Sequence, residues 1–563
     1  MKETMLQAAD VDYQKLVFQY RHSADQDAAQ PVRHPVVVVG AGPVGLALAI
    51  DLAQQNIPVV LLDNDDRLST GSRAICFAKR TLEVFDRLGC GERMVDKGVS
   101  WNVGKAFLKD EQVYAFNLLP ESGHQRPAFI NLQQYYVEGY LADRAAELPL
   151  IDIRWKNAVV GLTQFADHAV LEIETPDGPY RLAADHVVSC EGSRSTLRRL
   201  CGQESHGRTF KDRFLIADIK MKADFPAERW FWFDPPFHPG QSVLLHKQPD
   251  DVWRIDFQLG WDADPEVEKR PENIGPRVKT MLAHTALKDA EYELEWASVY
   301  TFSCLRMDQF RHGRVLFAGD SAHGVSPFGA RGANSGIQDA ENLAWKLAYV
   351  LQGRAGEALL DTYSPERVYA ADENIRNSSR ATDFITPKSE ISRLFRDATL
   401  QLAKEHEFAR RLVNSGRLSV PATLDGSVLN TADGDMFTGA MRPGAAAADA
   451  PVQVKGQPGW LLRQLTTGLF SALVFDGPQA AGQIAALQAA AEGVAPLQVL
   501  LVGARDLAGA TTLADPDGAV AQRYDGRPGT VYLLRPDQHV CARWRAPTTA
   551  DVQAALRRAL ALH

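Results

Sequence analysis

The sequence predicts an α/β protein with more than one domain, and three observations support this prediction. An apolar strand runs into a glycine-rich turn and an apolar helix within residues 34–52. A second strand, loop and helix follow one another within residues 314–347. The intervening residues 206–305 change to alternating and aromatic strands, typical of an antiparallel sheet. At 563 residues, the chain exceeds what one core usually holds, so two or three domains are expected.

The first strand ends in GAGPVG, residues 40–45, and so in a G-x-G-x-x-G turn. Glycine at the three motif positions permits a tight turn, close approach of a pyrophosphate, and close packing of helix on strand. The next strand, residues 58–62, is closed by a carboxylate 23 residues beyond Gly40, where it can bind ribose hydroxyls. The glycine triplet alone is a weak signal, but this context predicts dinucleotide binding by Gly40, Gly42, Pro43, Val44, Gly45 and Asp63.

The second strand, loop and helix read RVLFAGDSAHGVSPFGARGANSGIQDAENLAWKL. The strand ends at Gly319-Asp320, where a carboxylate can accept hydrogen bonds from a sugar-alcohol chain. Pro327, Gly329 and Gly332 form a loop whose backbone can approach a flat ring. A helix is expected from about Asn334, and its positive end favours the N1/C2 carbonyl edge of a reduced flavin. The run therefore predicts a flavin site rather than an ordinary strand-loop-helix connection.

Together, the two motifs resemble those of the group A flavoprotein monooxygenases, the family of para-hydroxybenzoate, phenol and 3-(3-hydroxyphenyl)propionate hydroxylases. The resemblance covers about residues 35–390. It implies that Asp320 binds the ribityl chain and that a loop lies beside the isoalloxazine ring, formed by Pro327, Gly332, Ala333 and Asn334. It also implies a noncovalent FAD cofactor with NADPH or NADH as co-substrate.

Further matches to the family concern contacts to the flavin. Arg73, in GSRAICFAKRTLEVF, resembles a cofactor-contacting arginine, and Gln134 resembles a flavin-contacting glutamine, with Gln133 as the alternative. Glu191 stands where the family usually has aspartate. Arg331 stands where many relatives have glutamine, and its guanidinium either stabilises an anionic flavin or substrate or pairs with a carboxylate on the loop.

The chemistry that the resemblance implies is hydroxylation of a phenolic ring through a C4a-hydroperoxyflavin, with O2 and a small phenol as the other reactants. Candidate catalytic residues are His246, Tyr300 and Arg331, although a lone histidine or tyrosine on a sheet is more often structural. His323 and Arg306 are weaker candidates. A flavin-dependent halogenase or oxidase is one alternative, but the W-x-W-x-I-P signature of halogenases fails at Asp234. A non-catalytic, redox-responsive FAD-binding module is another.

The expected architecture is a Rossmann-like, para-hydroxybenzoate hydroxylase-like FAD-binding domain with an inserted, mainly antiparallel substrate domain. Helices are expected at about 78–97 and 133–147. A Pro/Gly/Ala-rich stretch precedes a tail that resembles the thioredoxin-like domain of the phenol hydroxylase branch but has no C-x-x-C. We expect an extension at 1–34, the FAD-binding domain at 35–205 and 306–420, the substrate domain at 206–305, a linker at 421–444 and the thioredoxin-like domain at 445–563.

Composition excludes several other classes of protein. A formal charge of −9 gives no sign of the positively charged surface that binds nucleic acid. The six cysteines are scattered, which argues against a zinc site, a disulfide framework or a dithiol centre, so no metal is expected. No apolar run is long enough to span a bilayer, and the N-terminus lacks signal-peptide features, so a cytoplasmic location is expected. The sequence leaves open whether the chain forms a homodimer.

Overall fold

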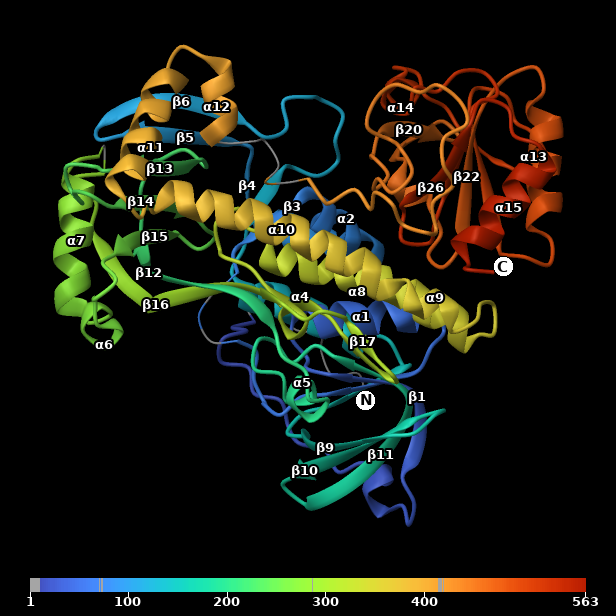
Figure 1. Ribbon diagram of the computed structural model, residues 1–563, viewed down its shortest axis with the longest axis horizontal. Helices are drawn as coiled ribbons and strands as arrows, with labels where there is room; N and C mark the ends of the chain where they lie inside the picture. Colours follow the sequence, from blue (N-terminus) through green and yellow to red (C-terminus); the bar gives the residue numbers. More distant parts are fainter. Residues whose placement is uncertain are drawn as a thin grey trace.

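The computed structural model describes residues 11–69, 71, 74–285, 287–413, 418 and 420–562. Figure 1 shows a mixed sheet at the centre and bottom, a largely antiparallel sheet at the left, and a smaller α/β unit with the C-terminus at the upper right. Two long helices, α8 (Gly332–Leu351) and α10 (Tyr363–Ile385), pack together between these bodies. The helices therefore connect the parts of the fold that position the site.

The first sheet is built on buried parallel strands. Its main path is β17 (Arg311–His312), β18 (Val315–Phe317), β11 (Gly178–Ser189), β1 (Val32–Val39), β2 (Val59–Leu62) and β8 (Ile151–Arg154). From β18 to β8 the neighbours pair in parallel, while β10 (Ala169–Thr175) and β9 (Ala158–Gln164) extend β11 as an antiparallel ribbon. Continuous burial of Val36–Val39 is typical of a strand covered on both faces.

Helices pack against this sheet and against one another. Helix α1 (Pro43–Gln54) contacts α8 and α4 (Gln134–Ala146). The helix expected at 78–97 is instead two helices, α2 (Lys79–Leu88) and α3 (Gly91–Lys97). The break occurs because Gly89 takes the left-handed conformation, with φ 92°, at the end of α2. Helix α8 begins at Gly332, slightly earlier than expected.

The second sheet joins strands from three parts of the chain. Its order is β19 (His323–Gly324), β16 (Tyr292–Arg306), β12 (His206–Met221), β15 (Val252–Leu259), β14 (Ser242–Lys247), β13 (Arg229–Phe233), β5 (Val103–Leu108) and β6 (Glu111–Asn117). The sheet thus extends beyond the expected segment 206–305, because β5 pairs in parallel with β13. The aromatic strand β13 is therefore an inner strand, with β14 on one side and β5 on the other.

The two faces of the second sheet have different neighbours. One face packs on α7 (Pro271–Ala283) through an apolar core that includes Trp253, Ile255, Val278 and Met281. Helices α11 (Glu390–Ala403) and α12 (Glu407–Val413) lie at the end formed by β5 and β6. A small sheet has the order β3 (Cys76–Ala78), β7 (Phe129–Asn131) and β4 (Val99–Trp101). It contacts the second large sheet through Asn131, whose Nδ2 donates to the Lys247 carbonyl of β14 at 2.8 Å.

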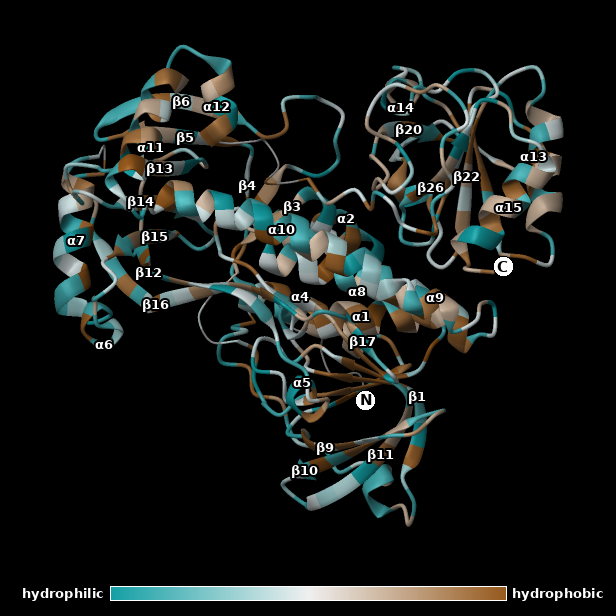
Figure 2. Cartoon of the chain, in the orientation of Figure 1, coloured by the Kyte–Doolittle hydropathy of each residue, from teal (hydrophilic) through white to brown (hydrophobic). Residues whose placement is uncertain are grey.

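The C-terminal unit has its own sheet and its own core. The strand order is β24 (Thr511–Leu513), β23 (Leu497–Val502), β22 (Phe470–Phe475), β25 (Val531–Leu534) and β26 (Val540–Trp544), with α13 (Ala480–Ala491) packed on α15 (Thr549–Ala559). Figure 2 shows the apolar character of β22 at the centre of this unit. The stretch expected as a linker lies along β26, since Gly444 N–H donates to the Val540 carbonyl and Thr431 N–H to the Cys541 carbonyl.

Buried charges join the C-terminal unit to the long helices. Glu366 on α10 accepts from Lys346 Nζ on α8 at 2.7 Å and from Arg535 Nη1 at 2.6 Å. Arg535 also pairs with Asp537 at 2.5 Å, and all four side chains are at most 2% exposed. Burial raises the pKa of Glu366, but the charges of Arg535 and Lys346 outweigh it and hold the pKa below its usual value. The junction is therefore charged and buried.

The N-terminal extension packs on the body of the chain over its described part. Tyr13 is 2% exposed, and its hydroxyl donates to Asp143 Oδ2 at 2.6 Å. Phe18 stacks on Trp155, with ring centroids 4.1 Å apart. Within the described ranges, no helix is long and apolar enough to cross a membrane.

Candidate flavin and substrate site

The glycine turn lies between β1 and α1 and leaves room for a ligand. Gly40 has φ 105°, and a Cβ there would lie 2.5 Å from the Cys190 carbonyl oxygen. A Cβ at Gly45 would lie 1.9 Å from the Gly40 carbonyl oxygen, so both positions are closed by packing. At Gly42, in contrast, a Cβ would meet nothing within 4 Å. In the part of the chain that the structure describes, no side-chain hydrogen bond caps α1, so its first N–H groups are available to an anion such as a pyrophosphate.

Asp63 follows β2 and stands beside this turn. Its Oδ2 accepts from the Ala41 N–H at 2.6 Å and its Oδ1 from the Asp65 N–H at 2.8 Å. Burial raises the pKa of Asp63, and the two backbone donors oppose that shift. The carboxylate is thus fixed at the carboxyl end of the parallel strands, where an α/β sheet binds nucleotides.

The GDSAH segment forms a short turn, η2 (Gly319–Ser321), after β18. Gly319 has φ 62°, and a Cβ there would lie 3.0 Å from Val44 Cγ2. A Cβ at Gly336 on α8 would lie 2.7 Å from the same atom. Val44 therefore brings together the two motifs, which are far apart in the sequence, and the turn presents Asp320 as an exposed side chain.

Asp339 on α8 holds this turn in place, and the sequence reasoning missed it. The carboxylate is 0% exposed and accepts from the Gly319 N–H at 2.9 Å, from His323 Nε2 at 2.6 Å and from Arg367 Nε at 2.6 Å. Burial raises its pKa, but His323 and Arg367 outweigh burial and hold the pKa below the usual value. His323 is thus a partner of Asp339 under the turn. The available signal was a charged residue on the buried side of an apolar helix.

The loop before α8 is fixed by Asn334. Its Oδ1 accepts from the Ala78 N–H at 2.8 Å and its Nδ2 donates to the Cys76 carbonyl at 2.9 Å. Asn334 therefore ties α8 to β3, while Gly332 and Ala333 remain partly exposed and Pro327 is exposed. Within the described residues, no side-chain hydrogen bond caps α8 at Arg331, which leaves the N–H groups of its first turn available to a ligand. Arg331 is mostly buried, and its Nη1 donates to Asn374 Oδ1 at 3.1 Å.

The other residues expected to contact the cofactor form hydrogen bonds within the protein where the structure describes them. Glu191 turns its carboxylate back on α5 (Thr196–Leu200), where it accepts from two serine hydroxyls and from the Thr196 and Leu197 N–H groups. Gln134 Oε1 accepts from the Ala74 N–H at 3.1 Å, whereas Gln133 Nε2 donates to the Pro249 carbonyl next to the second sheet. Arg73 lies outside the described residues. The roles of these residues toward a cofactor stay predictions.

The second sheet turns one face toward the loop before α8. Phe328 of that loop makes edge contacts with Phe214 and Phe302, with ring centroids 4.8 and 5.5 Å apart. Pairing across β12, β14, β15 and β16 places Leu244, Ile216 and Tyr300 on the same face, by the alternation of side chains along a strand. An aromatic and aliphatic surface therefore adjoins the flavin loop.

The other end of this face is polar. Arg254 donates two hydrogen bonds to Asp218, each 2.8 Å long. His246, 3% exposed, has its Nε2 3.7 Å from Asp256 Oδ2. Burial, together with the charges of Arg229 and Arg254, lowers the pKa of His246 well below its usual value, so its imidazole is neutral. Burial raises the pKa of Asp256 to about 6, against the opposing charge of Arg254.

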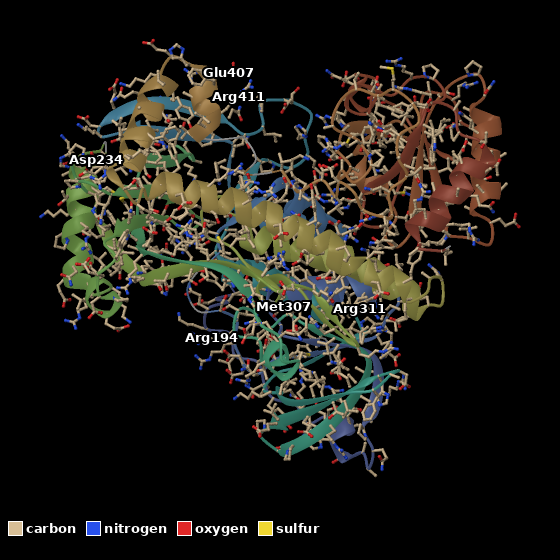
Figure 3. The ribbon with its side chains drawn as sticks, in the orientation of Figure 1. Arg194, Asp234, Met307, Arg311, Glu407 and Arg411 are labelled. Atoms are coloured by element: carbon tan, nitrogen blue, oxygen red, sulfur yellow. The ribbon has the colours of Figure 1, made fainter. Side chains whose placement is uncertain are left out.

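Two of the three expected catalytic residues lie on this face, and the third lies apart from them. His246 is at its polar end, on β14, and Tyr300 is at its aromatic end, on β16 and opposite Phe214. Arg331 is on the α8 side. Arg306 pairs with Asp372 at 2.6 Å, outside this arrangement. Figure 3 places Asp234, where the halogenase signature fails, at the outer end of β13 near α7.

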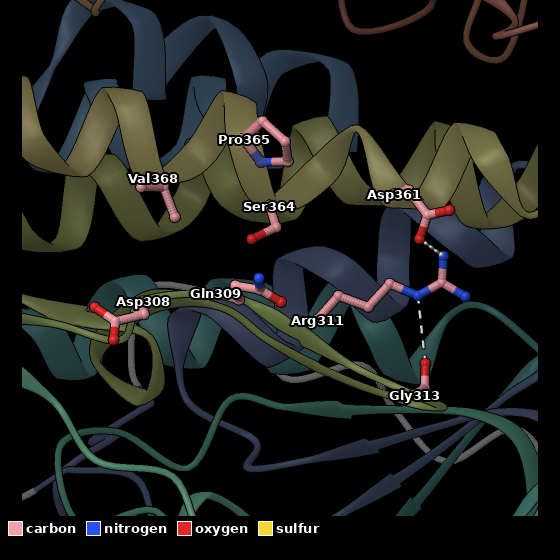
Figure 4. Close-up of a pocket in the computed structure, with 8 residues that line it drawn as sticks. All are labelled: Asp308, Gln309, Arg311, Gly313, Asp361, Ser364, Pro365 and Val368. Atoms are coloured by element: carbon pink, nitrogen blue, oxygen red, sulfur yellow. Dashed lines mark hydrogen bonds and ion pairs between the residues drawn. The ribbon is translucent and has the colours of Figure 1, made fainter.

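An open pocket of about 550 Å³ lies elsewhere, between the β17–β18 hairpin and α9 (Ala358–Asp361) with α10. Figure 4 shows Arg311 bridging Asp361 and the Gly313 carbonyl across one end of it. Its lining combines polar side chains with Pro365 and Val368 and includes none of the motif residues. The pocket therefore does not contribute to the flavin site.

A comparison with protein families identifies the fold that carries this site. A family described as an FAD binding domain matches residues 33–378, more than half of the chain. The chain belongs to this FAD-binding family. It is a group A FAD-dependent aromatic hydroxylase by descent, and its glycine turn, its Asp63 and the open end of α8 fit FAD.

Two relatives of similar length are named as a monooxygenase and a hydroxylase. The 6-methylpretetramide 4-monooxygenase of Streptomyces rimosus is 30% identical over 545 residues, which cover 94% of this chain and 93% of the relative. The probable NADH-specific resorcinol 4-hydroxylase of Rhodococcus jostii (strain RHA1) is 30% identical over 519 residues, covering 90% of this chain and 91% of the relative.

Solved structures share the FAD-binding monooxygenase fold. The flavin-dependent monooxygenase PieE, in complex with FAD and substrate, has a TM-score of 0.76 at 21% identity and covers 95% of this chain and 100% of its own. The aklavinone-11 hydroxylase, in complex with FAD and aklavinone, has a TM-score of 0.75 at 23% identity and covers 94% of this chain and 100% of its own.

Proposed function

We propose that this FAD enzyme hydroxylates a phenolic aromatic ring, using NAD(P)H as electron donor and O2 as oxygen source. The observation that carries the proposal is the sheet face beside the loop of α8, which is aromatic at one end and polar at the other. An apolar wall with a few convergent polar groups suits a ring that carries hydroxyls. FAD, when bound, supplies hydride acceptance from NAD(P)H and the activation of O2.

The residues of the chain would divide the work of binding. Gly42, the first N–H groups of α1 and Asp63 would hold the pyrophosphate and ribose of FAD, and Asp320 would hold the ribityl chain. The open N–H groups of α8 would face the carbonyl edge of the ring and favour negative charge there. Phe328, packed on Phe214 and Phe302, would exclude water from the oxygen-transfer side.

We further propose the domain division in which residues 35–205 and 306–420 bind FAD and 206–305 form most of the substrate domain. The parallel pair β22–β23 and the antiparallel pair β25–β26 support a thioredoxin-like unit from residue 445. The unit has no C-x-x-C, and the Cys541 thiol is buried, with its pKa raised by burial. It would therefore have a structural role.

The test is a panel of phenols, including resorcinols, hydroxyphenyl acids, chlorophenols and polycyclic phenols. We expect at least one to accelerate NAD(P)H oxidation and to give an ortho- or para-hydroxylated product containing oxygen from labelled O2. Oxygen uptake, peroxide and product mass are measured. If no member stimulates flavin reduction, or if all of the oxygen appears as peroxide, the proposal fails. A need for halide and a separate reductase would instead indicate a halogenase, and FAD binding without turnover a non-catalytic module.

A further inference from the structure

Three side chains at the polar end of the sheet face have buried atoms without partners. Within the described part of the chain, no hydrogen-bond partner is found for His246 Nδ1, Asp256 Oδ1 or Arg229 Nε. Buried polar atoms in folded proteins are nearly always paired. Three such atoms on one face of a sheet are therefore a candidate place for a ligand that supplies the missing partners.

The three side chains are neighbours on one face. His246 is on β14, between β15, which carries Asp256, and β13, which carries Arg229. His246 Nε2 lies 3.7 Å from Asp256 Oδ2, and the charge of Arg229 acts on both residues. It acts also on Cys76, whose carbonyl accepts from Asn334 of α8. The group thus lies on the side of the sheet that faces the flavin loop.

The charges of this group decide what kind of ligand it can take. Arg254 is engaged by Asp218 through two hydrogen bonds of 2.8 Å. Among the described residues of this group, this leaves one carboxylate, Asp256, and one guanidinium, Arg229, whose charges sum to zero. A ligand carboxylate would add a buried negative charge without compensation, which is costly. An uncharged hydroxyl adds none.

We propose that Asp256 accepts the proton of a phenolic hydroxyl on an uncharged substrate, while Arg229 stabilises the phenolate that forms. This inference rests on the proposed hydroxylase function. The O–H bond breaks, the proton moves to Asp256 Oδ1, and the electron pair stays on the phenolate oxygen, which enriches the ring. The local charge is unchanged by the transfer, because Asp256 loses the charge that the substrate gains. Neutral His246 donates or accepts a hydrogen bond at the same hydroxyl.

The remainder of the face fits the body of such a substrate. Leu244 and Phe231 are paired across β13 and β14, and Ile216 lies opposite Asp256 on β12. These three side chains are apolar, and Leu244 and Phe231 belong to the same apolar cluster as Phe214 and Phe328. The substrate class is therefore a phenol or fused-ring phenol without a carboxylate, rather than a hydroxyphenyl acid.

Titration of Asp256 suits this role. Burial raises its pKa to about 6, with Asp218 adding to the shift and Arg254 and Arg229 opposing it. His246 and Cys76 complete its polar surroundings. A general base is most effective when its pKa lies near the working pH. Above pH 6 the carboxylate is ionised and accepts a strong hydrogen bond from the phenol, and below pH 6 this acceptor is lost.

The first test measures binding without turnover. Resorcinol and 1,3-dihydroxynaphthalene are titrated into the oxidised holoenzyme at pH 5.0 to 8.0, and the flavin absorbance is followed. Affinity should fall about tenfold toward pH 5, where a carboxyl of this pKa is about one-tenth ionised. Asp256→Asn should make affinity independent of pH, whereas Asp251→Asn, in the exposed turn before β15, should behave as wild type. Absence of binding, or a pH dependence that survives in Asp256→Asn, would overturn the proposal.

The second test separates this inference from the proposed function. Asp256→Asn should lower kcat by about 10² to 10⁴ for a phenol that wild type hydroxylates. Normal turnover in this variant would overturn the inference and leave the hydroxylase function standing. If wild type binds phenols with the expected pH dependence but forms no product, the function fails and the binding site stands. If Asp256→Asn does not fold, Asp256→Glu keeps the acceptor and must keep the pH dependence.

A matched pair of ligands tests the charge argument. 3-Propylphenol and 3-(3-hydroxyphenyl)propionate differ in the terminal group of the side chain. The neutral phenol should bind at least about tenfold more tightly, because the acid brings an uncompensated charge. Tighter binding of the acid would contradict the assignment of the substrate class.

Discussion

Replacing Asp339 by asparagine should weaken the fold at the turn that carries Asp320. The carboxylate is 0% exposed and accepts three hydrogen bonds, from the Gly319 N–H, His323 and Arg367. Arg367 is itself 3% exposed, so it would be left as a buried cation without its carboxylate. Removing one partner of a buried pair typically costs about 3 to 5 kcal/mol. Asparagine keeps the shape and the acceptor for Gly319, so we expect about 3 kcal/mol, the lower end of that range.

The assay is urea unfolding of the holoenzyme, with flavin fluorescence reporting release of FAD. Asp361→Asn is the matched control, because its ion pair with Arg311 involves a carboxylate that is 71% exposed and should contribute at most about 1 kcal/mol. The folded pKa of Asp339 is below the usual value, so its contribution is present above the unfolded pKa of about 3.9 and is lost as pH falls through the folded value. The difference between wild type and variant should therefore shrink in acid. Equal stability of Asp339→Asn and Asp361→Asn at pH 7 would refute this reasoning.

Three further substitutions test other parts of the site, and a fourth tests the C-terminal unit. Asp320→Ala should weaken FAD binding tenfold to a hundredfold, about 1.5 to 3 kcal/mol, and unchanged affinity in a fluorescence titration would exclude the assigned role. Gly42→Ala should leave stability within about 0.5 kcal/mol of wild type yet weaken FAD binding, because its Cβ would enter the open space. Gly45→Ala should lower stability, since its Cβ would lie 1.9 Å from the Gly40 carbonyl oxygen; similar urea midpoints for the two variants would contradict this. Cys541→Ser should leave turnover intact, and loss of activity in a folded variant would point to a redox role.

The elements that the sequence predicted are those set by neighbouring residues. The turn at Gly40 and the strand before Asp320 follow from short patterns of glycine, apolar runs and carboxylates, and the structure has them in place. The break at Gly89 was also encoded locally, in the left-handed end of α2, and was overlooked.

What could not be predicted depends on pairing between distant strands. The parallel pairing of β5 with β13 is decided by tertiary packing, so the second sheet includes strands outside the expected segment 206–305. Asp256 and Arg229 share one face of the sheet only through the register of β13, β14 and β15. The hydrogen bonds that the Glu191 carboxylate accepts from Ser195 and from the first N–H groups of α5 could not be read from the sequence, and its role toward the cofactor stays a prediction.

The buried junction of Lys346, Glu366 and Arg535 bears on how this chain could be recombined with its relatives. A chimera that takes its C-terminal unit from another enzyme must supply a guanidinium at the position of Arg535. Without it, the buried Glu366 would keep Lys346 but lose its second cation. Crossover points placed in the polar stretch near residue 421 would separate these charges, although that stretch looks permissive in the sequence. Exchange of the whole block from α8 onward, with its charges intact, is the design that the junction permits.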